Sequence, residues 1–364
     1  MTILTVNAGS SSVRLALFDA GGGALRPLLR ARLEGDRLRP RDELRAFLAE
    51  RARPDAIAHR IVHGGAKLTR PCAIDRAVED EIARAAALAP LHNPRALEWI
   101  AAARELLPGV RQIAAFDTAF FAELPDAAAS YALPRALCRE FGIRRWGFHG
   151  LAHQSMWRAW LAQNRERPNA RVISFQLGAG CSAAAIAGGR PLDTSMGFTP
   201  LEGLVMATRS GDLDPGIIFH LLRERAVTLD GLERLLEARS GLAGVSGSSG
   251  DLGALLASTS DDARLAVELY VHRARKYLGA YLAVLGGADA VLFGGGVGEH
   301  LPEARARIAS RLEWCGVQLD AERNARASGT ARISADGSRV EAWVIAVDEE
   351  AVLAGEALAL GGRS

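Results

Sequence analysis

Hydrophobic residues gather in short runs along the chain, and the first runs predict a pair of buried strands. Residues 2–6 (TILTV) and 13–18 (VRLALF) lie on either side of a small polar segment, Asn7–Ser12. Apolar runs joined by glycine and serine are typical of a β-hairpin. The pattern therefore predicts a hairpin with a long glycine- and serine-rich tip.

The same pattern returns in the middle of the chain. Residues 172–177 (VISFQL) and 183–187 predict two strands that flank a second glycine loop, Gly178–Ser182. A third glycine loop, Gly294–Gly298, follows an apolar strand at residues 290–293. Two similar hairpins so far apart indicate an internal duplication, so we expect an α/β protein with two related halves.

Helices are predicted between these strands. Four segments have alanine-, leucine- or arginine-rich helical composition: Glu79–Leu88, Pro94–Leu107, His153–Asn164 and Asp261–Leu285. Residues Thr199–Glu202 fit a capping box with proline at the first helical position, which predicts a short helix towards Met206. Residues 20–58 are weakly patterned, and residues 241–260 are expected to form a flexible surface loop.

Composition and charge exclude several classes of protein. The 49% of hydrophobic and 24% of charged residues are ordinary globular values, which excludes disorder as the main state. Lysine and arginine number 44 against 42 aspartate and glutamate, a net charge of +2, which argues against nucleic-acid binding. Only Lys67 and Lys276 are lysines, so an anion site here must depend on arginine or on backbone N–H groups.

Cysteine usage and the apolar segments predict a cytoplasmic protein with no membrane span. The four cysteines form no Cys-x-x-Cys motif, and we expect them to be reduced. The N-terminal residues lack the features of a signal peptide. The longest apolar stretch, Tyr281–Gly298, is interrupted by Asp289 and by glycines, so it does not predict a membrane helix.

Three glycine loops that each follow a strand favour a nucleotide site. Such loops expose successive backbone N–H groups, and glycine lets a phosphate approach closely. None of them contains Gly-Lys-Ser/Thr, which excludes a P-loop, and none is a Gly-x-Gly-x-x-Gly that opens a helix with a distant acidic partner. A Rossmann dehydrogenase is therefore also disfavoured.

Polar residues that can do chemistry gather in five short segments: His59–Gly65, Pro90–Pro94, Phe116–Phe120, Gly147–Gly150 and Thr208–Pro215. Each has an ordinary structural interpretation, such as a helix cap or a surface ion pair. His149 and His153 have the spacing of a zinc site but lack the glutamate of His-Glu-x-x-His. Four of the eight histidines lie in these segments, which makes a purely structural interpretation of all of them less attractive.

The order of these segments resembles the acetate kinase family. The resemblance runs from residue 7 to about residue 354 and is carried by motifs in one order: NAGSSS, HRIVHGG, LAPLHNP, FDTAF, GFHG, DTSMGFTPLEGL, TRSGDLDP, FGGGVGE and DEEAVLA. It implies two duplicated RNase H-like domains with a nucleotide cleft between them, as in sugar kinases, actin and heat-shock ATPases. Residues 1–117 with 350–364 would form the first domain, and residues 118–349 the second, carrying most nucleotide loops and the dimer interface.

The resemblance also implies an activity and its participants. Such an enzyme transfers a phosphoryl group reversibly from ATP to acetate with Mg²⁺ or Mn²⁺, giving acetyl phosphate and ADP, and works as a cytoplasmic homodimer. The implied catalytic residues are Arg60, Asp117, His149 and Arg209, and the implied metal residues are Asn7 and Glu349. The implied acyl pocket consists of Val62, Leu91, His92, Phe148 and Pro200. The implied nucleotide contacts are Ser10, Ser12, Arg14, Gly178, Gly180, Asp251, Gly294, Gly295, Gly296 and Gly298.

Departures from the family pattern cluster on the nucleotide side. Arg14 stands for lysine, Asp348 for asparagine and Phe121 for histidine, and further changes lie at Gln176, Ala179, Gly253, Gly294 and His300. Three interpretations stay open: an acetate or propionate kinase with altered nucleotide contacts, a related kinase that uses pyrophosphate, phosphate or a non-adenine nucleotide, and a non-catalytic acyl-phosphate-binding protein. The intact acyl and transfer residues favour the first.

Overall fold

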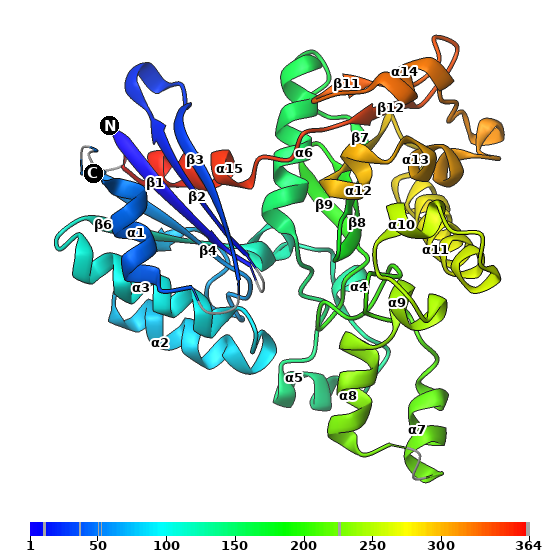
Figure 1. The fold of residues 1–364 in the computed structure, drawn as a ribbon, viewed down its shortest axis with the longest axis horizontal. Helices are drawn as coiled ribbons and strands as arrows, with labels where there is room; N and C mark the ends of the chain where they lie inside the picture. The colour runs from blue at the N-terminus through cyan, green and yellow to red at the C-terminus, as the bar shows by residue number, and fades with distance from the viewer. Residues whose placement is uncertain (10–11, 36–37, 50, 52, 225–226, 362–364) are drawn as a thin grey trace. The chain divides into compact units, whose positions relative to one another are not determined.

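The computed structural model describes residues 1–9, 12–35, 38–49, 51, 53–224 and 227–361. The chain divides into two compact units (Figure 1). Unit 1 comprises residues 1–122, 148–155 and 348–364, and unit 2 comprises residues 123–147 and 156–347. Each unit is built around one six-stranded mixed sheet with helices, so the predicted α/β fold with a duplicated architecture is confirmed.

The sheet of unit 1 has the order β3-β2-β1-β4-β6-β5. Its strands are β1 (Thr2–Ala8), β2 (Ser12–Asp19), β3 (Arg26–Glu34), β4 (Ala56–Ile61), β5 (Cys72–Ala73) and β6 (Arg111–Phe116). Strands β1, β4 and β6 are parallel, whereas β2, β3 and β5 run antiparallel to their neighbours. The α-helices that lie wholly in unit 1 are α1 (Pro40–Leu48), α2 (Arg76–Arg84), α3 (Asn93–Leu106) and α15 (Glu349–Gly361), and 3₁₀ turns lie at Gly21–Gly23, Ala85–Leu88 and Asp117–Phe121.

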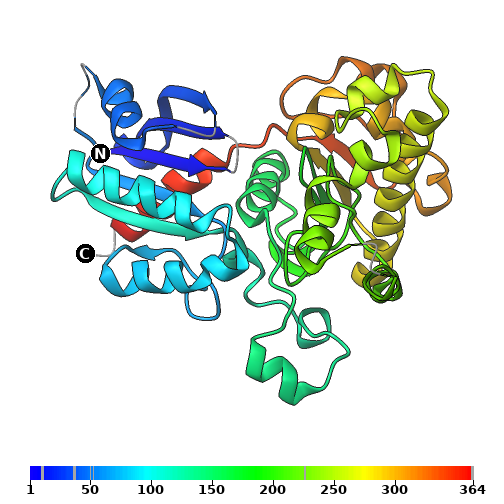
Figure 2. The same cartoon turned by 60° about the horizontal axis from the view of Figure 1, so that its bottom comes forward.

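Side-chain alternation gives this sheet two different apolar faces. One face packs Ile3, Ala58 and Ile113 against Val352 and Leu353 of α15. The other face packs residues such as Leu4 and Ile57 against Trp99 and Ala103 of α3, with Leu44 of α1. Figures 1 and 2 show α15, in red, on one side of the strands, and α1 and α3, in blue and cyan, on the other. We call the first side the α15 face.

The sheet of unit 2 has the order β11-β12-β10-β7-β8-β9. Its strands are β7 (Arg171–Leu177), β8 (Cys181–Ala187), β9 (Arg190–Thr194), β10 (Ala290–Gly294), β11 (Ala331–Arg332) and β12 (Glu341–Val344). The remaining helices are α4 (Asp126–Ala129), α5 (Arg135–Phe141), α6 (Gly150–Gln163), α7 (Pro215–Arg223), α8 (Leu229–Ala238), α9 (Gly241–Ser246), α10 (Leu252–Leu256), α11 (Asp261–Leu285), α12 (Gly295–His300), α13 (Pro302–Ala309) and α14 (Ala321–Arg326), with a 3₁₀ turn at Glu313–Cys315. The long helix α11 packs on β8 and carries nine buried residues, which makes it the main helical support of this sheet.

Both predicted hairpins are present, and their tips are shorter than the sequence indicates. Strand β1 continues through Asn7 and Ala8 because these residues pair with Arg14 and Val13 of β2. In the second hairpin, β8 already begins at Cys181, which pairs with Leu177. The four predicted helices are also present, with α11 at the predicted bounds.

Three local predictions are wrong. The third glycine loop is a strand end followed by α12, in which Glu299 accepts a hydrogen bond from the N–H of Gly295 at 3.2 Å. The capping-box segment at residues 199–202 forms no helix, because the carboxylate of Glu202 is engaged by Tyr131 and by Arg145 instead. Residues 241–260 are not a flexible loop: they form α9 and α10, whose Leu242, Leu252 and Leu255 are buried.

The weakly patterned region at residues 20–58 contains β3 and α1 as well as the start of β4. All four cysteines are free. Among the described residues, none of the helices combines the length and apolarity that crossing a bilayer requires.

Candidate active site

Asn7, Arg60 and Asp117 lie at the carboxyl ends of the three parallel strands of unit 1. Along a strand, side chains an even number of positions apart point to the same face of the sheet. Asn7 is four positions from Ile3 in β1, and Arg60 is two positions from Ala58 in β4, so both side chains point to the α15 face. Asp117 follows β6 directly. Because the carboxyl ends of parallel strands meet at one edge of a sheet, three polar residues distant in sequence come together here.

Arg60 joins the other two residues. Its Nε and Nη2 donate to Oδ2 of Asp117 at 3.1 and 2.6 Å, and its Nη1 donates to Oδ1 of Asn7 at 3.3 Å. The Asp117 side chain is fully buried and that of Arg60 is 12% exposed, so this ion pair is shielded from water. Burial raises the pKa of Asp117, and the opposing charge of Arg60 only partly offsets that effect.

Two glutamates at the start of α15 reach the same network. Nδ2 of Asn7 donates to Oε2 of Glu349 and to Oε1 of Glu350, both at 2.7 Å. Arg14, which pairs with Asn7 across β1 and β2, lies 3.8 and 3.9 Å from these two carboxylates. Burial raises the pKa of Glu349, but Arg60, Asn7, Arg14 and His149 together bring it below its usual value.

Glu350 was not among the predicted site residues. Burial and the neighbouring charge of Glu349 raise the pKa of the Glu350 carboxyl. Its place beside Glu349 in the DEE segment was the available signal, but consecutive residues of a helix usually point in different directions. Both side chains can contact Asn7 here because they occupy the first two positions of α15.

His149 occupies a strained backbone position next to this network. Its φ is +57°, which is uncommon for a residue with a side chain. The following Gly150 begins α6, and a Cβ at that position would lie 2.0 Å from the carbonyl oxygen of Asp117. Glycine is therefore required for α6 to start against the Asp117 backbone, which holds His149 near the carboxylates.

The predicted acyl-pocket residues of unit 1 have different environments. Val62 and Phe148 are buried, whereas Leu91 is 62% exposed. His92 is the residue before α3 and is partly exposed. The ring of His63 meets that of Phe148 edge to face, with centroids 5.7 Å apart.

Asn93 and Thr118 hold the backbone of the His63–Gly65 segment. The N–H of His63 donates to Oδ1 of Asn93 at 3.2 Å, and Nδ2 of Asn93 donates back to the His63 carbonyl at 2.9 Å. The N–H of Gly64 donates to Oγ1 of Thr118 at 3.1 Å. The roles of Asn93 and Thr118 were not predicted, although both lie inside the quoted motifs.

The predicted nucleotide residues of unit 2 gather around the ends of β7 and β10. The N–H of Gly178 donates to the Gly180 carbonyl at 3.1 Å, which closes the tight turn between β7 and β8. Gly294 pairs with Gln176 across the parallel strands, and a Cβ on Gly295, whose φ is +76°, would lie 2.6 Å from the Leu177 carbonyl oxygen. The start of the second glycine segment is therefore in direct contact with Leu177, the residue before Gly178.

The segment that carries Arg209 lies beside the first of these turns. The N–H of Ala207 donates to the Ala179 carbonyl at 3.0 Å. Nη1 of Arg209 donates to the Pro200 carbonyl at 3.3 Å, and burial lowers the pKa of this guanidinium. Among the described residues, Glu237 is the carboxylate whose charge acts on Arg209 and partly offsets this effect of burial.

Two other predicted nucleotide contacts are placed differently, and a third is not described. Oδ1 of Asp251 accepts a hydrogen bond from the N–H of Ala254 at 2.7 Å, so this residue caps α10. Ser12 is the first residue of β2, and its carbonyl accepts from the N–H of Gly9. Ser10 lies outside the described residues.

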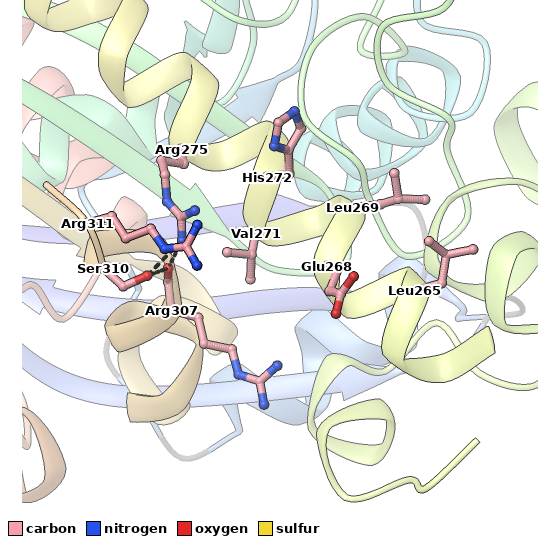
Figure 3. A pocket seen from close by; sticks show the side chains of 9 residues that line it. All are labelled: Leu265, Glu268, Leu269, Val271, His272, Arg275, Arg307, Ser310 and Arg311. Atoms are coloured by element: carbon pink, nitrogen blue, oxygen red, sulfur yellow. Dashed lines mark hydrogen bonds between the residues drawn. The ribbon is translucent and has the colours of Figure 1, made fainter. Parts of the chain in front are cut away.

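A pocket of about 670 Å³ in unit 2 is separate from all these residues (Figure 3). It lies along α11 and the segment after α13, and Arg275, Arg307 and Arg311 are among its lining residues. Nη2 of Arg275 donates to Oγ of Ser310 at 2.8 Å, and its Nε donates to the Ile308 carbonyl at 3.3 Å. Arg275 therefore binds the carboxyl end of α13, which accounts for its place in the pocket.

Comparison with known proteins identifies the family of the chain. The model of the acetokinase family matches residues 42–355. The chain belongs to the acetokinase family. It is 47% identical over 307 residues to the acetate kinase of Chloroherpeton thalassium, covering 82% of this chain and 74% of that protein.

Solved structures of the acetokinase family have the same fold over nearly the whole chain. The acetate kinase of Porphyromonas gingivalis has a TM-score of 0.88 at 34% identity and covers 99% of both chains. A propionate kinase from Francisella tularensis subsp. tularensis has a TM-score of 0.88 at 32% identity, covering 98% of this chain and 99% of that one. The chain is accordingly a kinase that transfers a phosphoryl group to a carboxylate, in a family that uses ATP.

Proposed function

We propose that this chain is an acetate kinase that transfers a phosphoryl group reversibly from ATP to acetate, giving acetyl phosphate and ADP. The observation that carries the proposal is the buried network of Arg60, Asp117 and Asn7 with the two glutamates of α15. Polar groups held this rigidly at the ends of parallel strands suit the positioning and charge neutralisation that phosphoryl transfer requires.

Two arginines carry the proposed chemistry. The planar guanidinium groups of Arg60 and Arg209 would bind oxygens of the transferring phosphoryl group and of the carboxylate. His149 would donate to the oxygens on which charge accumulates in the transition state. Asp117 fixes the orientation of Arg60 through two hydrogen bonds to one carboxylate oxygen. No covalent nucleophile is needed, because the acceptor carboxylate attacks the phosphorus directly and in line.

The residues around Asn7 fit a magnesium ion. Within the described residues, no three His, Cys, Asp or Glu side chains form a complete metal cage. Magnesium, however, is usually held by one or two carboxylates together with substrate phosphates and water. Oδ1 of Asp117 is buried without a hydrogen-bond partner, which leaves an oxygen available nearby.

Carboxylates outnumber guanidinium groups around Asn7. The side chains of Asp117, Glu349 and Glu350 gather there with those of Arg14 and Arg60. Asn7 and Glu349 would hold the ion. When bound, it would neutralise phosphate charge.

The glycine segments at Gly178–Gly180 and Gly294–Gly298 would hold the nucleotide phosphates through backbone N–H groups, with Ser10, Ser12 and Arg14 contributing from unit 1. The domain bounds expected from the sequence, residues 1–117 with 350–364 and residues 118–349, differ from the two compact units at residues 118–122, 148–155 and 348–349. The altered side chains Gln176, Ala179, Gly253 and His300 would weaken nucleotide contacts without removing the backbone donors.

The residues proposed for the acyl pocket are Val62, Leu91, His92, Phe148 and Pro200, a set that would suit a short apolar chain. Propionate is the second acceptor, because a propionate kinase is as similar in fold as an acetate kinase. One added methylene changes the free energy of binding by only about 1–3 kcal/mol, so strict discrimination is not expected. The working enzyme would be a cytoplasmic homodimer joined through unit 2.

The test follows the loss of acetyl phosphate in the presence of Mg²⁺ with ADP, with phosphate and with neither. Loss that requires ADP and yields ATP is the expected result. Loss with phosphate but not with ADP would identify a pyrophosphate-forming kinase instead. No loss in any mixture would overturn the assignment of acetate, and the same assay with propionyl phosphate would then identify the acceptor.

A further inference from the structure

Three arginines of unit 1 share the α15 face beside the proposed site. Arg14 of β2 pairs with Arg32 of β3, and Ala16 of β2, on the same face as Arg14, pairs with Arg30. Arg30 and Arg32 are two residues apart on one strand, so their side chains emerge on the same side of the sheet. Of the three, Arg30 makes the most extensive contact with the start of α15.

Arg30 holds Asp348 with both ends of its guanidinium. Nη1 donates to Oδ1 of Asp348 at 3.2 Å, Nη2 donates to Oδ2, and Nη1 also lies 3.8 Å from Oε2 of Glu350. The guanidinium carbon lies 5.5 Å from the ring centroid of Phe18, which is buried in the core of the α15 face. Arg30 is therefore oriented from the apolar side by an aromatic ring and from the polar side by a carboxylate.

Asp348 is also the residue that starts α15. Its Oδ1 accepts a hydrogen bond from the N–H of Ala351 at 2.9 Å, and its own N–H donates to Oγ of Ser155 at 2.9 Å. The next two residues are Glu349 and Glu350, the first residues of the helix and the partners of Asn7. The contacts that hold Asp348 in place therefore also determine the position of the Glu349 and Glu350 carboxylates.

We propose that Arg30 and Asp348 are positioning residues that fix the start of α15, so that Glu349 and Glu350 meet Asn7 where a magnesium ion would bind. The inference rests on the proposed magnesium site and names two residues outside it. The side chain of Arg30 is 44% exposed and that of Asp348 is 35% exposed. An ion pair this accessible contributes little to stability, so a purely stabilising role does not account for it.

Substitutions can separate this positioning from the capping of α15. In Asp348→Asn the side chain still accepts from the N–H of Ala351, because asparagine is a good N-cap residue, but the charge that Arg30 binds is lost. Arg30→Ala removes the ion pair and leaves the cap untouched. Asp348→Ala removes both. Arg32→Ala is the matched control, because Arg32 shares strand and face with Arg30 but pairs with the exposed Glu34 at 3.0 Å.

Two measurements on the full chain test the proposal: calorimetric titration with ADP, with and without Mg²⁺, and the dependence of turnover on Mg²⁺ at saturating ATP. We expect Arg30→Ala and Asp348→Asn each to reduce the gain in ADP affinity that Mg²⁺ gives by about tenfold, the usual effect of losing a residue that orients a metal ligand. The KM for Mg²⁺ should rise by a similar factor, with a smaller change in kcat. Thermal unfolding of these two variants should match the wild type.

The double variant Arg30→Ala/Asp348→Asn should be no worse than either single variant, since the two residues act as one unit. Arg32→Ala should behave like the wild type, and Asp348→Ala should add a loss of thermal stability. If Mg²⁺ increases ADP affinity in both Arg30→Ala and Asp348→Asn as much as in the wild type, this inference is overturned, but the proposed function is not. Equal ADP affinity with and without Mg²⁺ in the wild type would overturn the proposed metal site, and this inference with it.

Discussion

Asn7 accepts a hydrogen bond from Arg60 through its side-chain oxygen, at 3.3 Å, while its side-chain nitrogen faces Glu349 and Glu350. The Asn7 amide therefore binds a guanidinium group through its oxygen and two carboxylates through its nitrogen. Neither aspartate nor a hydrocarbon side chain offers both a donor and an acceptor in this shape. The contact joins the ends of β1 and β4 to the first turn of α15.

Replacing Arg60 by alanine should abolish most activity and also destabilise unit 1. The fully buried carboxylate of Asp117 would lose its only cationic partner within ion-pair distance among the described residues. Leaving a buried charge unpaired costs about 3–5 kcal/mol, which should appear in urea unfolding. The double variant Arg60→Ala/Asp117→Asn should recover much of this stability and none of the activity. Unchanged stability in Arg60→Ala would contradict the burial of this ion pair.

Gly150→Ala should displace His149. The added methyl group would lie 2.0 Å from the Asp117 carbonyl oxygen and 2.7 Å from Cβ of Phe120, so the start of α6 must move. We expect a loss of about 1–3 kcal/mol in the free energy of unfolding, as for other overpacked positions, together with a lower kcat.

Gly279→Ala is the matched control for that substitution. Gly279 lies inside α11, where an added Cβ meets nothing within 4 Å. It should stabilise the protein by up to about 1 kcal/mol, because alanine favours helices more than glycine does. Equal changes in the free energy of unfolding for the two substitutions would contradict the close contact between position 150 and the Asp117 backbone.

Protonation of His59 should lower the stability of the protein as the pH falls below neutral. Burial lowers the pKa of His59 to about 4, whereas the unfolded chain has a value of about 6.5. The unfolded state thus binds more protons between these values, and stability should fall as the pH drops from about 6.5 to about 4. The difference amounts to about 3 kcal/mol. His59→Leu, which cannot titrate, should show a flatter dependence of Tm on pH in this window. A slope equal to that of the wild type would contradict the prediction.

Tyr131→Phe should loosen the segment that carries Pro200. The Tyr131 hydroxyl donates to Glu202 and accepts from the N–H of Phe198 at 2.8 Å, so its removal leaves two groups without this partner. Such losses cost about 1–3 kcal/mol. If Pro200 lines the acyl pocket, the KM for acetate should rise more than the KM for ATP. Equal changes in both would place Pro200 outside that pocket.

Local sequence patterns predicted strands better than they predicted loops. Apolar runs such as those in β7 and β10 identify strands because buried strands need them. Glycine and serine, by contrast, suggested loops at α9 and α12, where packing outweighs low helical propensity. Leu242 is buried in the first case, and Glu299 binds the N–H of Gly295 in the second.

The motifs of the candidate site could be found from sequence, but their partners could not. Asn7 and Glu349 are 342 positions apart, and no local periodicity reports a contact over that distance. Arg30 lies in β3, whose sequence has too few apolar residues at alternate positions to predict a strand. Its contact with Asp348 could therefore not be predicted. Residues that support a site from a neighbouring strand carry no motif of their own.

The place of α15 in the chain has a consequence for synthesis. The helix covers the α15 face and supplies Glu349 and Glu350, yet it is translated after the whole of residues 156–347. While a ribosome makes that long segment, the sheet of unit 1 has one apolar face without its helix, and Asn7 lacks its carboxylate partners. The larger unit therefore has time to fold first, and a nascent chain becomes competent for phosphoryl transfer only after α15 is made.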